Sequence, residues 1–177
     1  MHPNMKNKSS IHKNTYIAKT AEICGGGVML DEGVSIWPQA ILRADVKPIT
    51  IGKFSNIQDQ VMIHGTHDSH YHPGGFETII GANVTIGHKA MIHGAIIDDY
   101  CLVGMSSIIL DGAKLDKYVY IGAGSLVPPK KHLTTGLWVG SPVKKVRELT
   151  EKEIHMIQYS SEHYWKLAQH YKKELAC

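Results

Sequence analysis

An aliphatic side chain recurs every six residues through most of this 177-residue chain. Twelve of the sixteen steps between successive members of the series are six residues long, and the fourth residue after a member is usually small or β-branched. A period of six matches neither a helix, at 3.6, nor one face of a flat sheet, at 2, but suits a short strand and a tight corner repeated many times. Because only 7% of the residues are aromatic, the enclosed core is expected to be thin and aliphatic. The members are Ile17, Ile23, Leu30, Ile36, Leu42, Ile51, Ile57, Ile63, Ile80, Ile86, Ile92, Ile97, Val103, Ile109, Leu115, Ile121 and Val127.

Four steps break the period, and the longest of them marks an insertion. Seventeen residues separate Ile63 from Ile80, eleven more than the period requires. The inserted stretch is polar and contains a Pro-Gly-Gly sequence, which favours a turn. We expect a loop over residues 66–79 that projects from the repeat, as insertions on the functional face of repeat proteins often do.

A helical pattern follows the end of the repeat at Val127. Thr150 and Glu153 have the spacing of a capping box, and apolar residues recur at helical intervals after them. We therefore predict a β-solenoid over residues 1–147 and a helix over residues 148–177 that packs back along it. The apolar positions of this helix are Ile154, Ile157, Tyr164, Leu167, Ala168, Tyr171 and Leu175.

Composition and charge argue against several classes of partner and location. A net charge of +3 without a basic run does not favour a nucleic-acid partner. The sequence has no apolar stretch long enough for a membrane span or an export signal. Cys24, Cys101 and Cys177 are odd in number and widely spaced, which fits a reducing cytoplasm better than a disulfide framework.

Three of the twelve histidines fall into register with the repeat. His64 and His93 each follow a repeat aliphatic, and their separation of 29 residues becomes 18, or three hexads, once the eleven inserted residues are removed. Arg43 lies one coil from His64, and Asp59 lies one coil from His88 on the preceding face. Coils stack about 4.8 Å apart, so His64 and His93 can reach one ion, whereas His88 is about 15 Å away along the chain. A symmetric trimer would bring His88 of one subunit against His64 and His93 of the next.

This register predicts a metal site between the subunits of a homotrimer. Three imidazoles with an open fourth position are typical of catalytic zinc, although Fe²⁺, Co²⁺ or copper suit the same ligands. The alternative is three unrelated surface histidines. Charged and amide side chains nearby, namely Arg43, Asp45, Gln58 and Asp59, favour the metal.

The same residues lie in motifs that resemble those of the gamma-class carbonic anhydrases. The similarity covers nearly the whole chain. The long loop after the first histidine resembles that of a bacterial branch of carbonic-anhydrase-like proteins. The similarity implies a left-handed parallel β-helix of hexapeptide repeats, a handedness opposite to that of ordinary crossovers. The motifs are Arg43-Ala44-Asp45, Ile51-Gly52, Asn56-Ile57-Gln58-Asp59, His64, and Ile86-Gly87-His88-Lys89-Ala90-Met91-Ile92-His93-Gly94.

The resemblance implies an enzyme that hydrates carbon dioxide reversibly to bicarbonate. In such a site zinc lowers the pKa of its bound water to about 7, and the resulting hydroxide attacks carbon dioxide. His64 and His93 would bind the metal from one subunit and His88 from its neighbour. The other implied site residues are Gln58, which orients the bound water, Asn56, which helps to place it, Arg43, Asp45 and Asp59, which form interface charges near the metal, and Tyr159, which approaches from the helix.

The chain departs from the family pattern where protons leave the site. Well-characterised members carry acidic residues just after the Arg-x-Asp motif and in the loop after the first histidine. Here Val46 follows Asp45, and the loop offers histidines instead. A histidine with a pKa near 6.5 can shuttle protons, so we hypothesise that His67 or His70 does so. Two alternatives stay open: a catalytically weak metal-binding scaffold, and a hexapeptide-repeat acyltransferase that uses coenzyme A and one histidine as general base.

Overall fold

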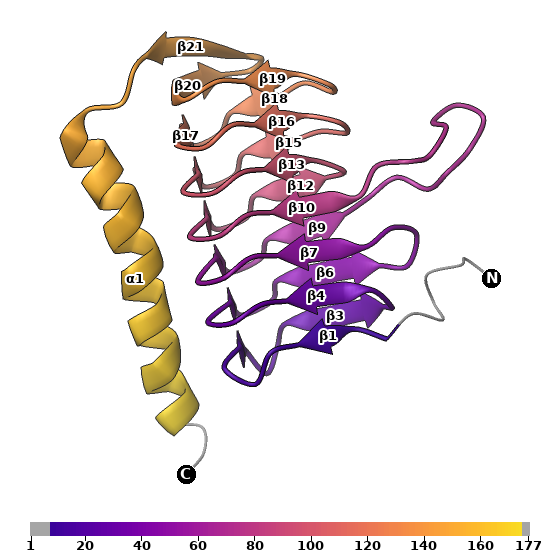
Figure 1. Cartoon of the computed structure of the whole chain (residues 1–177), viewed down its shortest axis with the longest axis vertical. Helices are drawn as coiled ribbons and strands as arrows, with labels where there is room; N and C mark the ends of the chain where they lie inside the picture. The colour runs from indigo at the N-terminus through magenta and orange to yellow at the C-terminus, as the bar shows by residue number, and fades with distance from the viewer. Residues whose placement is uncertain (1–7, 175–177) are drawn as a thin grey trace.

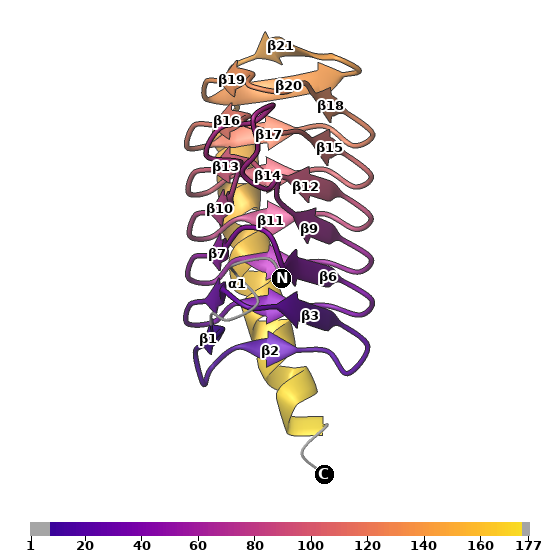
Figure 2. The ribbon, with the colours of Figure 1, turned by 90° about the vertical axis from the view of Figure 1, so that its right-hand side faces the viewer.

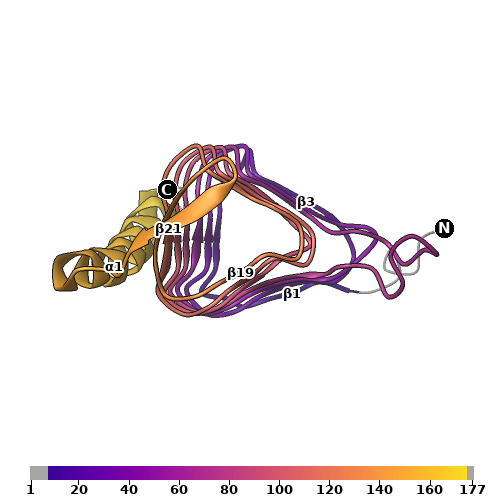
Figure 3. The ribbon, with the colours of Figure 1, turned by 90° about the horizontal axis from the view of Figure 1, so that it is seen from above.

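A computed structural model, which describes residues 8–174, is a triangular prism of short strands with one helix along its side (Figure 1). Viewed along the prism, successive coils superimpose as a triangle (Figure 3). Three sheets, whose strands are parallel apart from one terminal hairpin, form its faces (Figure 2). The prediction of a left-handed parallel β-helix with a C-terminal helix is confirmed.

Each of the first six coils contributes one strand to each sheet, and the last coil adds β19 to sheet A and β20 to sheet B, where β21 pairs with β20. Sheet A contains β1 (Ser10–Ile11), β4 (Val28–Leu30), β7 (Ile49–Ile51), β10 (Thr78–Ile80), β13 (Ile96–Ile97), β16 (Lys114–Leu115) and β19 (His132–Leu133). Sheet B contains β2 (Tyr16–Ile17), β5 (Ser35–Ile36), β8 (Asn56–Ile57), β11 (Thr85–Ile86), β14 (Leu102–Val103), β17 (Val119–Ile121), β20 (Gly136–Gly140) and β21 (Val143–Arg147). Sheet C contains β3 (Glu22–Gly25), β6 (Ile41–Ala44), β9 (Met62–His64), β12 (Met91–His93), β15 (Ile108–Ile109) and β18 (Leu126–Val127).

The six-residue series forms the core of the prism. Its members pair in register with those one coil away, as Ile57 does with Ile86 in sheet B and Ile63 with Ile92 in sheet C. From Leu30 to Val127 all members are buried, whereas those of the first coil are only partly so. Burying one such side chain stabilises the fold by about 1.5–3 kcal/mol, so the stacked column accounts for the regular coiling.

The corners between sheets B and C explain why small residues recur four positions after each aliphatic. The corner residues Gln60 and Lys89 adopt left-handed backbone, with φ of 62° and 60°. The residue after each of them, Val61 and Ala90, then points inward and is at most 1% exposed. A larger side chain would not fit at this narrow angle of the triangle, because interiors are close-packed.

The predicted insertion projects from the corner between sheets C and A (Figures 1 and 3). It leaves the prism after β9 and returns at β10, and an antiparallel bridge between Thr66 and Phe76 closes its base. The expected range 66–79 extends slightly too far, because Thr78 and Ile79 already belong to β10.

The C-terminal helix α1 (Glu151–Glu174) packs against sheet B. Thr150 and Glu153 form the predicted capping box, with Thr150 N donating to Glu153 Oε2 at 2.8 Å and Glu153 N donating to Thr150 Oγ1 at 3.3 Å. Hydrogen bonds from Arg147 and Thr150 lower the pKa of Glu153 to about 2. Ile157 and Ala168 are buried as predicted, while Leu175 lies outside the described residues. Among residues 8–174, no helix is both long and apolar enough to cross a membrane.

Two cysteines are free thiols in the described part of the chain. Cys24 is partly exposed in β3, and Cys101 is fully buried in a coil of the prism. Burial raises the pKa of Cys101 to about 12, so its thiol stays protonated and acts as a small core side chain. Cys177 lies outside the described residues.

Candidate metal site

His64 and His93 lie side by side at the ends of β9 and β12 and are paired across sheet C. Since Ile63 and Ile92 point into the core, the alternation of a strand turns both histidines to the outer face. His64 Nδ1 lies 3.1 Å from His93 Nε2. The pair therefore presents two ring nitrogens to one point on the surface.

A carboxylate bonds the other nitrogen of each of these rings. His64 Nε2 donates to Asp45 Oδ1 at 3.0 Å, and His93 Nδ1 donates to Asp111 Oδ1 at 2.6 Å. Arg43 donates to His64 Nδ1 at 3.3 Å, which requires a lone pair on that nitrogen, and a metal bound there would displace this N–H. In neutral rings held this way, both facing nitrogens carry lone pairs and repel one another at 3.1 Å. A cation bound by both would convert this repulsion into attraction.

The charges around His64 favour its neutral, metal-binding form. Burial lowers the pKa of His64, and the positive charge of Arg43 lowers it further, although the hydrogen bond to Asp45 opposes both. Burial alone would raise the pKa of Asp45, but hydrogen bonds from His64 and Arg43 hold it below its ordinary value. Arg43 Nη1 donates to Asp45 Oδ2 at 2.5 Å, so this carboxylate is ionised and fixed by two partners.

His88 lies on a turn at the corner between sheets B and C. The turn spans residues 87–90 and is closed by a hydrogen bond from Ala90 N to Gly87 O at 3.1 Å, with Lys89 in the left-handed conformation. His88 Nδ1 lies 2.8 Å from Asp59 Oδ2, and 39% of its side chain is exposed. As with His64 and His93, a carboxylate occupies one nitrogen and leaves the other, here Nε2, for a ligand.

His64 and His93 have the donor chemistry of two ligands of a divalent metal. In the part of one chain that the structure describes, no group of three or more His, Cys, Asp or Glu side chains could hold a metal ion. His64 and His93 supply two nitrogens 3.1 Å apart, close to the separation of about 3.3 Å that a tetrahedral zinc with 2.0–2.1 Å bonds requires. Carboxylates that bond the second nitrogen of a metal-binding histidine are usual around such sites.

Gln58 and Asn56 lie beside His88 and not beside the histidine pair of the same chain. His88 N donates to Gln58 Oε1 at 3.2 Å, and Gln58 Nε2 donates to Asn56 Oδ1 at 3.1 Å. Asn56 Nδ2 then donates to Thr85 Oγ1 at 2.9 Å across sheet B. Both amides are buried. Gln58 therefore lies next to any metal site to which His88 contributes a ligand.

The remaining predicted residues lie further from these ligands. His67 and His70 are exposed on the projecting loop, where the ring of His70 lies against Tyr71 with centroids 3.7 Å apart. Tyr159 is 64% exposed on α1, and its ring stacks on His163. Since α1 covers sheet B, the structure does not bring Tyr159 to the outer face of sheet C that carries His64 and His93.

Sequence reasoning missed Asp111 and Thr66. Asp111 lies one coil beyond His93, and its second oxygen, Oδ2, accepts from Thr66 Oγ1 at 2.7 Å. Gly94 makes room for this contact, because a Cβ there would lie 2.4 Å from Asp111 Oδ1. The separation of 18 residues between His93 and Asp111, one full coil, was the available signal.

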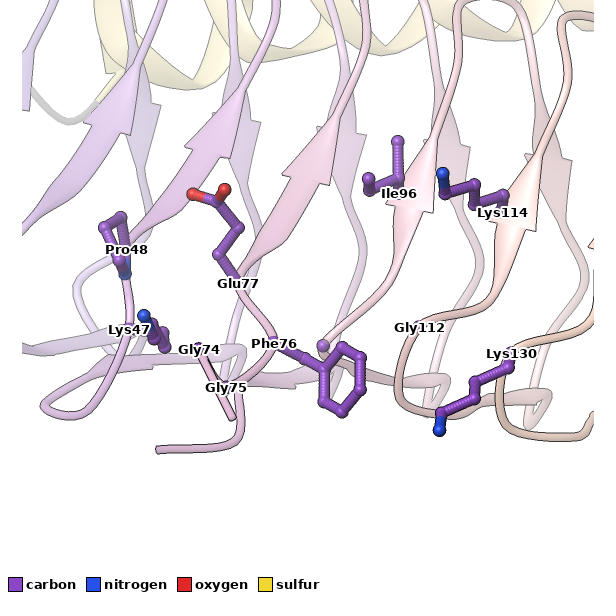
Figure 4. Close-up of a pocket in the computed structure, with 11 residues that line it drawn as sticks. Lys47, Pro48, Gly74, Gly75, Phe76, Glu77, Ile96, Gly112, Lys114 and Lys130 are labelled. Carbon is purple, nitrogen blue, oxygen red and sulfur yellow. The ribbon is translucent and has the colours of Figure 1, made fainter. Parts of the chain in front are cut away.

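A pocket of about 570 Å³ lies beside the base of the loop on sheet A (Figure 4). Lys47, Lys114 and Lys130 lie along its wall together with Glu77. Figure 4 shows Lys47 and Lys130 at opposite ends, so the ammonium groups do not converge on a common point. The pocket therefore offers no built anion site.

Comparison with known proteins places the chain among carbonic anhydrase relatives. Protein YrdA of Escherichia coli is 53% identical over 144 residues, 80% of this chain and 78% of that protein. A probable carbonic anhydrase of Methanocaldococcus jannaschii is 46% identical over 165 residues, 90% of this chain and 96% of that protein. Gamma carbonic anhydrase 2 of Arabidopsis thaliana mitochondria is 38% identical over 165 residues, 93% of this chain and 59% of that protein.

Among solved structures, a hexapeptide transferase family protein of Anaplasma phagocytophilum superposes with a TM-score of 0.84 at 36% identity, over 92% of each chain. No family model matches the chain. The sequence relatives and the shared fold nevertheless agree over most of the prism. The chain therefore belongs to the gamma-carbonic-anhydrase-like family of hexapeptide-repeat proteins.

Proposed function

We propose that this protein is a homotrimeric, zinc-dependent carbonic anhydrase of the cytoplasm that interconverts carbon dioxide and bicarbonate. The observation that carries this proposal is the set of three histidines, each with one ring nitrogen held by a carboxylate. Two of the remaining nitrogens already face each other at 3.1 Å. The third ligand, His88, forms no three-ligand group with them in the described part of one chain, so in this proposal it completes the pair of a neighbouring chain.

An apolar ladder on the outer face of sheet C supports the trimer. Its side chains lie on adjacent strands in register, next to the column that holds His64 and His93. In the single chain Met91 is 41% exposed and Ile108 is 39% exposed. A neighbouring subunit would cover this surface and, in a ring of three, bring its own His88 to the histidine pair. The ladder consists of Ile41, Met62, Met91, Ile108 and Leu126.

Each side chain of the proposed site has a separate role in the reaction. Zinc, when bound, supplies a Lewis acid that activates water near neutral pH for attack on carbon dioxide. Asp45, Asp59 and Asp111 hold the three imidazoles in the tautomers that leave a nitrogen for the metal. Gln58 uses one Nε2 hydrogen for Asn56, and its other N–H can orient the attacking water.

Stopped-flow hydration of carbon dioxide tests this function. We expect zinc-loaded protein to exceed the rate of the matched His88→Ala protein by about 100-fold or more. The His88→Ala chain should retain the fold, because its side chain lies outside the aliphatic core. Anaerobically iron-loaded protein is measured in parallel to compare metals. Fully metallated protein that gives only the rate of the variant would refute the proposal and favour the metal-binding scaffold.

If His67 or His70 carries protons away from the site, removing both histidines should lower kcat when the buffer is dilute. In the His67→Ala/His70→Ala double variant, we expect kcat at low buffer concentration to fall about 10- to 100-fold, since positioned proton transfer contributes at least that much. Added imidazole should restore the rate, and kcat/KM for carbon dioxide should change little. Full turnover of the double variant in dilute buffer would exclude both histidines as shuttles.

An acyltransferase is the second candidate, because the neighbour of TM-score 0.84 is named a hexapeptide transferase family protein. Such an enzyme needs one histidine as general base and has no use for three carboxylate-held imidazoles. Specific micromolar binding of coenzyme A together with metal-independent acyl transfer would favour it over the anhydrase.

A further inference from the structure

The C-terminal helix carries a hydroxyl that ends a buried hydrogen-bond chain leading to Gln58. Ser160 Oγ of α1 lies 3.0 Å from Thr85 Oγ1, and Thr85 accepts a hydrogen bond from Asn56. Asn56, Gln58 and Thr85 are 0%, 5% and 3% exposed, and each of them bonds at least one other protein group of this hydrogen-bond chain. We propose that Ser160 is a positioning residue for Gln58, acting through Thr85 and Asn56. This assignment of a role in catalysis rests on the function proposed above.

The backbone N–H of His88 fixes the donor-to-acceptor direction of this series of hydrogen bonds. The backbone N–H of His88 can only donate, so it must face the oxygen of the Gln58 amide. The NH₂ group of Gln58 then points to Asn56 Oδ1, and the NH₂ group of Asn56 points to the hydroxyl of Thr85. Flipping Gln58 would set its NH₂ group against the His88 N–H and its oxygen against Asn56 Oδ1, and flipping Asn56 would set two NH₂ groups against each other. Each amide is therefore held in one orientation as long as the next partner is in place.

Ser160 holds the far end of this chain. Thr85 receives the N–H of Asn56 and retains its own hydroxyl hydrogen and a second lone pair, either of which can bond Ser160. A cavity of about 280 Å³ adjoins the chain, with Gln58, Thr85, His88 and Ser160 among its lining residues. Without the Ser160 hydroxyl, water in this cavity would compete for Thr85 without a fixed position. Asn56 would then be held less firmly, and the Gln58 amide would move more freely about the orientation that the His88 N–H selects.

The adjacent residue Ser161 provides a matched control. Ser161 is 3% exposed on the same helix, but its hydroxyl contacts Asn83 and the carbonyl of Gln158 instead of Thr85. Ser160→Ala and Ser161→Ala each remove one helix hydroxyl, and alanine favours the helix, so both chains should fold. Ser160→Thr keeps a hydroxyl at the position and serves as the rescue variant.

The test measures hydrogen exchange of the Gln58 side-chain amide and does not depend on catalytic activity. In metal-free, full-length protein labelled with ¹⁵N-glutamine, we expect the side-chain N–H groups of Gln58 to exchange with solvent about 10-fold faster in Ser160→Ala. Ser160→Thr should restore slow exchange, and Ser161→Ala should leave it unchanged. Unchanged exchange in Ser160→Ala, or equal acceleration in Ser160→Ala and Ser161→Ala, would overturn the proposal.

Hydration kinetics separate this inference from the proposed function. In zinc-loaded trimer, Ser160→Ala should lower kcat/KM about 3- to 10-fold, the value of one hydrogen bond, with zinc content unchanged. Rapid hydration that Ser160→Ala leaves intact would overturn the role of Ser160 while the anhydrase stands. A wild-type rate no higher than that of His88→Ala, together with faster amide exchange in Ser160→Ala, would refute the anhydrase and support Ser160 as the residue that positions Gln58.

Discussion

Equal mixing of His64→Ala and His88→Ala chains is expected to restore metal to about a quarter of the sites, although neither variant binds metal alone. The reason is that each proposed site takes His64 and His93 from one subunit and His88 from the next. In randomly assembled trimers, about half of the sites draw the histidine pair from an intact chain, and about half of those meet an intact His88. Zinc content after mixed refolding and removal of loosely bound metal measures the result.

The matched control mixes His64→Ala with His93→Ala chains. Both substitutions damage the histidine pair, which one subunit supplies as a unit from β9 and β12. No mixed trimer of these two chains holds an intact site, so zinc content should stay at the background of the single variants. Restoration in the control, or its failure in the first mixture despite mixed trimers, would contradict the interfacial site.

Removal of the Asp111 carboxylate is expected to weaken zinc binding about 10- to 100-fold in the Asp111→Ala variant. Asp111 accepts the Nδ1 hydrogen of His93 at 2.6 Å, which selects the tautomer that leaves Nε2 facing His64. Without that acceptor the ring can rotate or carry its proton on Nε2, and its basicity toward the metal falls. Competition with a chromophoric chelator measures the affinity of the trimer before and after the change.

Asp116→Ala is the control for this prediction. Asp116 makes a similar contact, with His132 Nε2 at 2.7 Å, but both side chains are about half exposed on sheet A, away from the site. Its loss should leave zinc affinity within about twofold of the wild type, because surface ion pairs contribute little. Equal affinity in Asp111→Ala and wild type would show that His93 does not depend on Asp111 to bind metal.

Local regularity explains why the sequence alone predicts so much of this fold. Each hexad contains its own inward aliphatic and its own corner, so the period specifies the coil without reference to distant residues. The same arithmetic brings His64 and His93 together, because removing the eleven inserted residues leaves one full coil between them. The capping box of α1 is equally local, since Thr150 and Glu153 lie three residues apart. Two boundaries differ from the prediction: β10 begins at Thr78, inside the expected loop, and the helix begins at Glu151 and not at residue 148.

The orientation and partners of the site's side chains required the tertiary structure. Asp45 and Asp59, expected as interface charges, each bond a histidine of their own chain. The helix follows no hexad register, so no spacing in the sequence could place Ser160 against Thr85, 75 residues away. A six-residue repeat determines which positions share a face of the prism. Which nitrogen of a histidine remains for a metal depends on rotamers and hydrogen bonds between different coils, and packing alone sets these.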